Sequence, residues 1–225
     1  MSRALAAAGA GALLVGLAWA PVLAGRRTLM PAIPGGLAAP APGRPTWFLM
    51  DPMDSAWQNY PLARMVRAGW RAGGPPLWTA DTGCGEPLVA PALGAVTSPW
   101  RAWTAFVPAT ARAWDLYLLT RLATAAGLAW WWAASLGLRG AGRWTVAAAF
   151  ALGGHLTLYA NQWFLDADVL LPGLAGAVLG WTARGSRAAR LGVALAGGAI
   201  LLAGQPQAAL LAGIFAAVLG ADAAR

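Results

Sequence analysis

Apolar runs separated by short polar segments make up most of the chain. A helix that crosses the ~30 Å hydrocarbon core of a bilayer needs about 20 apolar residues. Apolar runs cover residues 4–25, 114–138, 144–160, 168–183, 188–204 and 206–219. Some are shorter than this ideal, and a locally thinner bilayer accommodates short spans. The pattern predicts an all-α integral membrane protein with a single membrane domain over residues 1–225 and about six transmembrane helices.

The first run, residues 4–25, has two interpretations. It contains Ala18-Trp19-Ala20, a small-residue pattern typical of a signal-peptide cleavage site. The apolar core of a signal peptide is ~7 to 15 residues long, which is shorter than this run. A retained transmembrane helix is therefore favoured, and a cleaved signal peptide is the alternative.

Composition supports the membrane assignment. The chain is 59% hydrophobic and 11% charged, whereas soluble proteins carry roughly 25% charged residues. All 16 of its cations are arginines. Most of them lie between apolar runs, where they orient helices and contact lipid phosphates, so we exclude nucleic acid as a partner and expect membrane lipid instead. Cys84 is the single cysteine, which excludes an internal disulfide.

The distribution of arginines also predicts the topology. Short loops rich in arginine face the cytoplasm, and two such loops contain Arg139, Arg143, Arg184, Arg187 and Arg190. This places the N-terminus in the cytoplasm and the large loop 26–113 on the extracytoplasmic side of the cell's inner membrane. Arg26 and Arg27 oppose this orientation, because they follow the first run and outnumber Arg3 before it.

Two acidic residues in the large loop are candidates for chemistry. Asp51 and Asp54 lie three residues apart, directly after the apolar segment that ends at Met50. Such a pair can ligate a hard cation such as Mg²⁺ or Mn²⁺, or take a proton from a hydroxyl. The alternative is a solvated turn, which Asp51-Pro52 would initiate.

A short amphipathic helix is predicted after Asp54, with Pro61 in its first turn. Apolar residues share one face, and another face carries Arg64, Arg67 and Arg71. This pattern is typical of a helix that lies in the membrane interface, with its guanidinium groups level with phosphates. Either the helix is a non-specific anchor, or its arginines bind a lipid-linked phosphate.

A series of short motifs resembles a known family. The motifs are Asp54-x-x-x-Gln58-x-x-Pro61, the Gly69 region, Pro76-Leu77-Trp78, Gly85-x-Pro87-Leu88, Ser98-Pro99 and Gly204-Gln205-Pro206-Gln207. In this order they resemble the YfhO-like membrane proteins, which belong to the superfamily of GT-C-fold glycosyltransferases that use polyprenyl-phosphate sugars. The resemblance implies sugar transfer to an acceptor of the cell envelope at the outer membrane face.

The same resemblance implies roles for individual residues. By motif position Asp54 is the catalytic base or metal contact, with Asp51 second, while arginines steady the leaving phosphate. His155 is a further candidate because the topology places it on the same side as Asp54, although a structural, hydrogen-bonded histidine is the alternative. The expected substrate-binding residues are Gln58, Arg64, Arg67, Trp78, His155, Gln205 and Gln207.

The chain departs from this family in two respects. Gln205 stands where the family often has histidine, and the chain corresponds only to the N-terminal half of the longer family architecture. We therefore expect a truncated form, which is a fragment, an inactive remnant, or a split gene product whose fold a second membrane polypeptide completes. A non-catalytic lipid-handling or transport protein and a membrane scaffold subunit are the alternative classes.

Overall fold

The computed structural model describes residues 3–30, 60–74, 76–80, 84–88, 96–104 and 110–223. Helices dominate these residues, which confirms the all-α fold class. The helices are α1 (Arg3–Ala18), α2 (Ala20–Leu23), α4 (Tyr60–Arg71), α5 (Pro99–Thr104), α6 (Ala111–Ser135), α7 (Ala141–Ala151), α8 (Gly154–Leu158), α9 (Leu165–Asp168), α10 (Leu171–Arg184), α11 (Arg187–Leu202) and α12 (Pro206–Ala223). Two short antiparallel strands, β1 (Trp78–Thr79) and β2 (Glu86–Pro87), pair Trp78 with Pro87.

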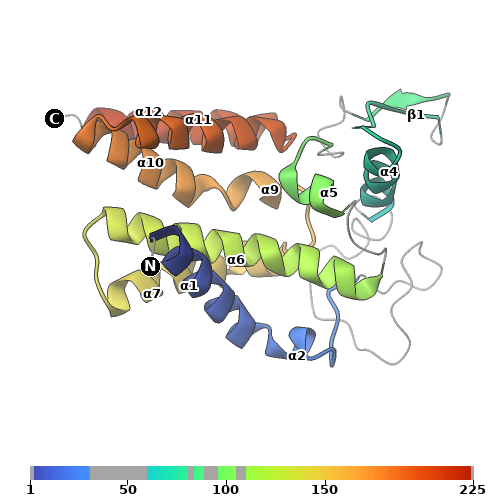
Figure 1. Cartoon of the computed structure of the whole chain (residues 1–225), viewed down its shortest axis with the longest axis horizontal. Coiled ribbons are helices and arrows are strands. Elements are labelled where there is room, and N and C mark those ends of the chain that lie inside the picture. The colour runs from blue at the N-terminus through green and yellow to red at the C-terminus, as the bar shows by residue number, and fades with distance from the viewer. Residues whose placement is uncertain are drawn as a thin grey trace.

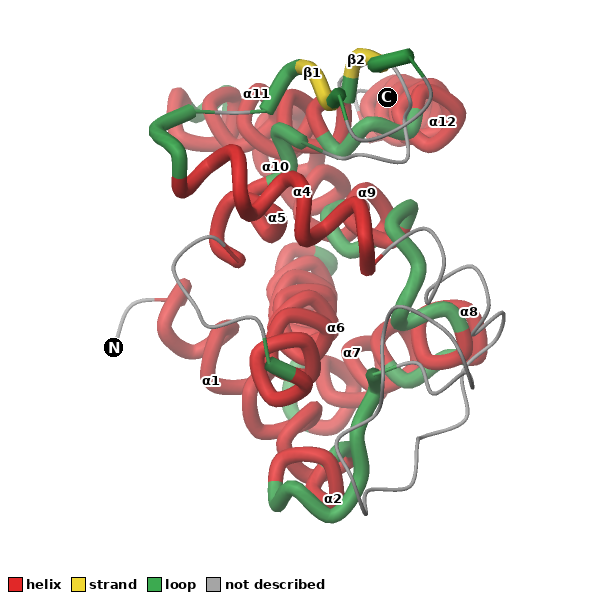
Figure 2. The backbone as a smooth tube through the Cα atoms, turned by 90° about the vertical axis from the view of Figure 1, so that its right-hand side faces the viewer, coloured by secondary structure: helices red, strands yellow, loops and turns green. Residues whose placement is uncertain are grey.

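The helices form two layers (Figure 1). One layer consists of α1, α6 and α7, and the other of α10, α11 and α12. Helix α6 lies at the centre, because it packs against α1 and α7 in its own layer and against α10 in the other. Helices α4 and α5 and the two strands lie together at one end of the bundle, as both views show (Figure 2).

Small residues let the layers approach closely. A Cβ atom added to Gly127 on α6 would lie 2.7 Å from the carbonyl oxygen of Ala7 on α1. One added to Gly176 on α10 would lie 2.5 Å from the ring of Trp131 on α6. Both positions therefore require glycine for steric reasons, as expected for membrane helices that pack through small residues.

One helix among those described has the length and composition of a membrane span. It is α12, with 18 residues, while α1 is apolar but shorter. Six transmembrane helices are thus not supported by this criterion. The reason is that several predicted runs are interrupted: Pro21 lies in the first turn of α2, Gly153 separates α7 from α8, and Pro172 lies in the first turn of α10. Proline removes a helical hydrogen bond and glycine weakens the helix.

Large apolar side chains are exposed on the outside of the bundle, mainly on α11 and α12. They include Leu191, Leu195, Leu201, Leu202, Leu210, Leu211, Ile214, Phe215 and Val218. Ala212 is the only residue of α12 that is buried. A contiguous apolar surface of this kind marks contact with lipid or with another protein.

Several exposed arginines lie toward one end of the bundle. The N-terminus, the α6–α7 turn, the α10–α11 turn and the C-terminus lie toward the same end (Figure 1). These segments carry the exposed arginines Arg3, Arg139, Arg184, Arg187 and Arg190. The grouping follows the predicted arrangement of the loops, while the side of the membrane that this end faces stays a prediction.

Candidate functional site

A cleft of about 660 Å³ lies between the two helix layers. Residues of α6, α7, α8, α9, α10 and α12 line it, and so do Phe164 just before α9 and Gln205 just before α12. Its walls are mostly aliphatic and aromatic. The aromatic lining residues are Trp132, Phe150, Phe164 and Phe215, and the polar ones are His155, Asp168, Gln205 and Gln207.

A histidine–carboxylate pair lies at this cleft. Nε2 of His155 lies 2.9 Å from Oδ2 of Asp168. The His155 side chain is 58% exposed, and that of Asp168 is 19% exposed. The imidazole ring stacks on Phe164, with 6.0 Å between ring centroids. The pair is thus open to a ligand on one side and held by an aromatic wall on the other.

The interruptions in the helices put these polar residues at the cleft. Gly153 is extended and begins α8, so His155 lies in the first turn of a new helix. Asp168 ends the short helix α9. Gly204 has φ +82° and lies between α11 and α12, and Pro206 then begins α12, which places Gln205 and Gln207 on either side of a helix start.

Two lining residues have polar atoms without a hydrogen-bond partner among the described residues. They are Oε1 of Gln205, an acceptor, and Nε1 of Trp132, a donor; both atoms are buried. Buried polar groups in native proteins are nearly always paired, so each such atom calls for an explanation. Both atoms lie beneath the surface of the cleft, so a ligand in the cleft does not reach them.

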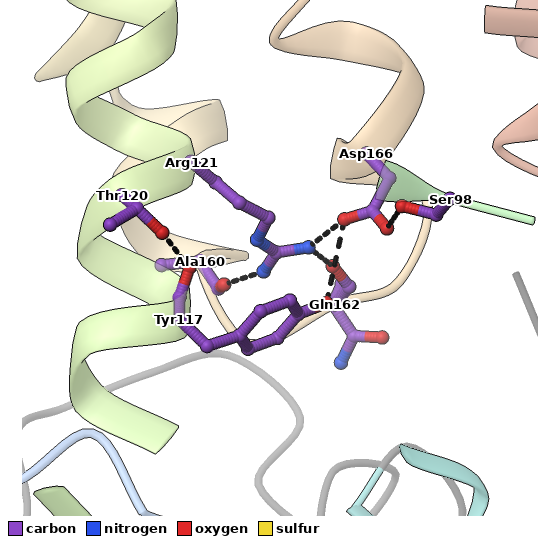
Figure 3. Close-up of polar contacts among 7 residues, drawn as sticks. All are labelled: Ser98, Tyr117, Thr120, Arg121, Ala160, Gln162 and Asp166. Carbon is purple, nitrogen blue, oxygen red and sulfur yellow. Dashed lines mark hydrogen bonds and ion pairs between the residues drawn. The ribbon is translucent and has the colours of Figure 1, made fainter. Parts of the chain in front are cut away.

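A buried network lies next to the cleft and holds α9 in place (Figure 3). Arg121 on α6 forms an ion pair with Asp166, with 2.5 Å between Nη1 and Oδ1, and both side chains are fully buried. Arg121 also donates to the carbonyl oxygens of Gln162, at 2.9 Å, and of Ala160. Ser98 donates to the other carboxylate oxygen of Asp166 at 2.5 Å.

This network pairs residues that are far apart in the sequence. Arg121 pairs with Asp166 inside the protein, although Asp115 is much nearer to it along the chain. Asp115 instead accepts hydrogen bonds from the Thr28 hydroxyl, at 2.9 Å, and from the Leu29 amide, at 2.6 Å. Asp166 is thus the counter-ion of Arg121. Because Asp166 and Asp168 share α9, the network also positions the carboxylate that pairs with His155.

The candidate residues from the sequence separate into three groups. His155, Gln205 and Gln207 meet at the cleft, although 50 positions separate His155 from Gln205. Asp51, Asp54 and Gln58 lie outside the described residues. Arg64, Arg67 and Trp78 are described but do not line the cleft, and Trp78 is 60% exposed. Asp168 and Trp132 join the cleft without having been singled out for it, because nothing local in the sequence marks them as binding residues.

Helix α4 differs from the expected interfacial helix in its packing. Val66 on its apolar face is buried against Leu88 and Val96, and Nε1 of Trp70 donates to the carbonyl oxygen of Val96 at 3.1 Å. The apolar face is thus covered by the protein itself, so it is not free to enter a bilayer. The exposed part of the helix carries Arg64.

Metal binding is not evident in the part of the chain that the structure describes. No group of three or more His, Cys, Asp or Glu side chains is close enough together there to hold a metal ion. Asp51 and Asp54 lie outside this part, so a divalent ion at that pair stays a prediction.

A second cleft, of about 670 Å³, lies between α1 and α6. Its lining residues are Ala4, Ala7, Ala8, Thr120, Ala123, Thr124, Gly127, Leu128 and Trp131. Both threonine hydroxyls donate to backbone carbonyl oxygens of α6, those of Tyr117 and Thr120. This cleft therefore offers neither a charge nor an unpaired hydroxyl donor.

No family model, curated protein or solved structure matches this chain. The resemblance to YfhO-like proteins accordingly rests on the sequence motifs alone.

Proposed function

We propose that this chain is a membrane glycosyltransferase-like protein that transfers a sugar from a polyprenyl-phosphate donor to an extracytoplasmic acceptor. In this proposal the cleft between the layers binds one of the two lipid-borne reactants. The observation that carries it is the His155–Asp168 pair, with Nε2 and Oδ2 2.9 Å apart, at an otherwise apolar cleft. Apolar walls suit a hydrocarbon chain, and a few polar groups at one place orient a headgroup.

The surroundings of the cleft also suit a lipid ligand. Phe215 and Leu211 line the cleft, and they belong to the same helix as the exposed Leu210 and Ile214. An amphiphile that lies along α12 therefore reaches the cleft without leaving apolar surroundings. A volume of about 660 Å³ is within the usual range for small-molecule sites.

The interrupted helices are compatible with several spans in the inner membrane, the N-terminus being cytoplasmic. Non-helical backbone at membrane depth is tolerated where it is buried in protein or lines a cavity. The breaks near Gly153 and Leu170 flank the residues that line the cleft. We therefore retain about six spans as part of the proposal, with α1–α2, α7–α8 and α9–α10 as broken helices.

The proposed reaction is a displacement at the anomeric carbon of the donor. The acceptor hydroxyl oxygen forms the new bond to this carbon, the bond from carbon to phosphate oxygen breaks, and polyprenyl phosphate leaves. The hydroxyl proton passes to a carboxylate base, which the resemblance assigns to Asp54. Arg64 or Arg67 is assigned to the charge of the leaving phosphate.

A non-catalytic lipid-handling protein is the second candidate. Broken helices around a site within the membrane are typical of transporters, and the cleft has this arrangement. Unlike a glycosyltransferase, a lipid-handling protein needs no proton acceptor at Asp54.

The test is sugar transfer from polyprenyl-phosphate donors in membranes that contain equal amounts of each variant. We expect Asp54→Asn to abolish transfer and His155→Gln to reduce it. Asp222→Asn, an exposed carboxylate near the C-terminus, is the matched control and should transfer normally. Transfer by Asp54→Asn at the wild-type rate would refute the assigned base, and lipid movement without any transfer would favour the second candidate.

A further inference from the structure

The polar residues at the cleft indicate which reactant it binds. We infer that the cleft between α7, α10 and α12 holds the neutral, hydroxyl-bearing headgroup of a glycolipid acceptor, and not the phosphate of the donor. This inference rests on the proposed function and adds the chemical class of the ligand to it. Three observations carry it: the charge of the lining residues, their capacity for hydrogen bonds with hydroxyl groups, and the aromatic walls.

The charge at the cleft disfavours a phosphate. Among the described residues that line the cleft, Asp168 is the only acidic one, and His155 is the only one that can carry a positive charge, since no arginine is among them. With neutral imidazole the lining residues have a net charge of −1, and with imidazolium they have a net charge of 0. The net charge is positive in neither state, whereas sites for phosphate groups use cations, usually arginine.

The polar side chains at the cleft can bind hydroxyl groups. The amide of Gln207 both donates and accepts hydrogen bonds, and the carboxylate of Asp168 accepts them. A hydroxyl is donor and acceptor at once, so it matches both side chains. The phosphodiester of the donor supplies only acceptors, and its charge would oppose that of Asp168.

The walls suit a sugar that is joined to a hydrocarbon chain. Phe164 stacks on His155 at the cleft, and an aromatic ring there can cover the apolar face of a pyranose while polar neighbours bind its hydroxyls. Phe150 and Phe215 add aromatic surface for an attached chain. The paired His155 and Asp168 then contact the headgroup, which is the part that carries the attacking hydroxyl in the proposed reaction.

The test is equilibrium binding of radiolabelled octyl β-glucoside to the purified full chain in micelles of a polyoxyethylene alkyl ether, which has no sugar. Unlabelled octyl glucoside, octyl phosphate and octanol serve as competitors. We expect saturable binding, with octyl phosphate and octanol each at least about tenfold weaker than octyl glucoside, a loss of ~1.4 kcal/mol. Competition by octyl phosphate that equals or exceeds that of octyl glucoside would overturn the inference.

Variants connect the binding to the cleft. Asp168→Asn and Gln207→Ala should each weaken glucoside binding, and Asp168→Asn should also narrow the difference between glucoside and phosphate. Gln207 is exposed, so replacing its side chain by alanine leaves the packing of the protein interior unchanged. Asp222→Asn is the control and should bind as the wild type does; unchanged binding in both cleft variants would place the glucoside elsewhere and overturn the inference.

The transfer assay separates this inference from the proposed function. Glucoside binding with no sugar transfer by any form of the protein would leave the inference standing and remove the glycosyltransferase proposal. Sugar transfer combined with preferential binding of octyl phosphate would overturn the inference and leave the glycosyltransferase proposal standing.

Discussion

The two clefts have nearly equal volumes, about 660 and 670 Å³, and flank the contact between α6 and α10. The views show α1 on one side of α6, and α7 and α12 on the other (Figure 2). Their linings differ because their helices differ. The middle segments of α1 and α6 line the second cleft with mostly apolar residues, whereas the ends of α8, α9 and α12 bring polar side chains to the first. Two clefts of nearly equal volume thus differ in chemistry because helix ends meet at only one of them.

The largest effect should come from the buried pair behind the first cleft. Asp166→Asn leaves Arg121 buried without its counter-ion, which typically costs about 3–5 kcal/mol of stability. We expect the free energy of unfolding, measured by chemical denaturation in micelles, to fall by about that amount. Glucoside binding should fall as well, because α9 carries both Asp166 and Asp168.

The double variant Arg121→Gln with Asp166→Asn is the control for this effect. It removes both charges, so it should recover part of the stability that the single variant loses. Equal stability of wild type and Asp166→Asn would show that the pair does not support the first cleft.

An intermediate effect is expected at the second cleft. Gly127→Val places a side chain against the backbone of Ala7. A Cβ atom at residue 127 would lie only 2.7 Å from the carbonyl oxygen of Ala7. Overpacking of this kind costs about 1–3 kcal/mol, which denaturation would detect. Glucoside binding should be retained, because none of the residues that line the second cleft also lines the first.

Gly197→Ala on α11 is the matched glycine substitution. An added Cβ atom meets nothing within 4 Å there, and alanine favours a helix by about 0.5–1 kcal/mol over glycine. A destabilisation as large as that of Gly127→Val would contradict the close approach of α1 and α6.

The smallest effect on stability should come from His155→Gln, although its effect on binding should be large. The His155 side chain is 58% exposed, and exposed ion pairs contribute about 0–1 kcal/mol. We therefore expect a nearly unchanged free energy of unfolding together with weakened glucoside binding. A loss of stability similar to that of Asp166→Asn would make His155 a structural residue, which was the alternative interpretation from the sequence.

The helical content was predictable because its determinants are local. Each predicted apolar run contains helix, and the run 114–138 corresponds to α6 over Ala111–Ser135. Close packing between α6 and α10 is present where Trp131 lies against Gly176. The breaks in several runs were harder to predict, because hydrophobic composition continues across them and only single prolines and glycines mark them.

By itself, the sequence determined the apolar runs, the arginine-rich turns between them and the residue types available for chemistry, since composition and a period of 3.6 residues depend on neighbours along the chain. Only the tertiary structure decided which polar groups meet. Arg121 pairs with Asp166 rather than with the nearby Asp115, and Ser98 reaches the same carboxylate from 68 positions away. The reason is that a buried charge must be paired wherever packing places it, and packing brings together helices that are far apart in the chain.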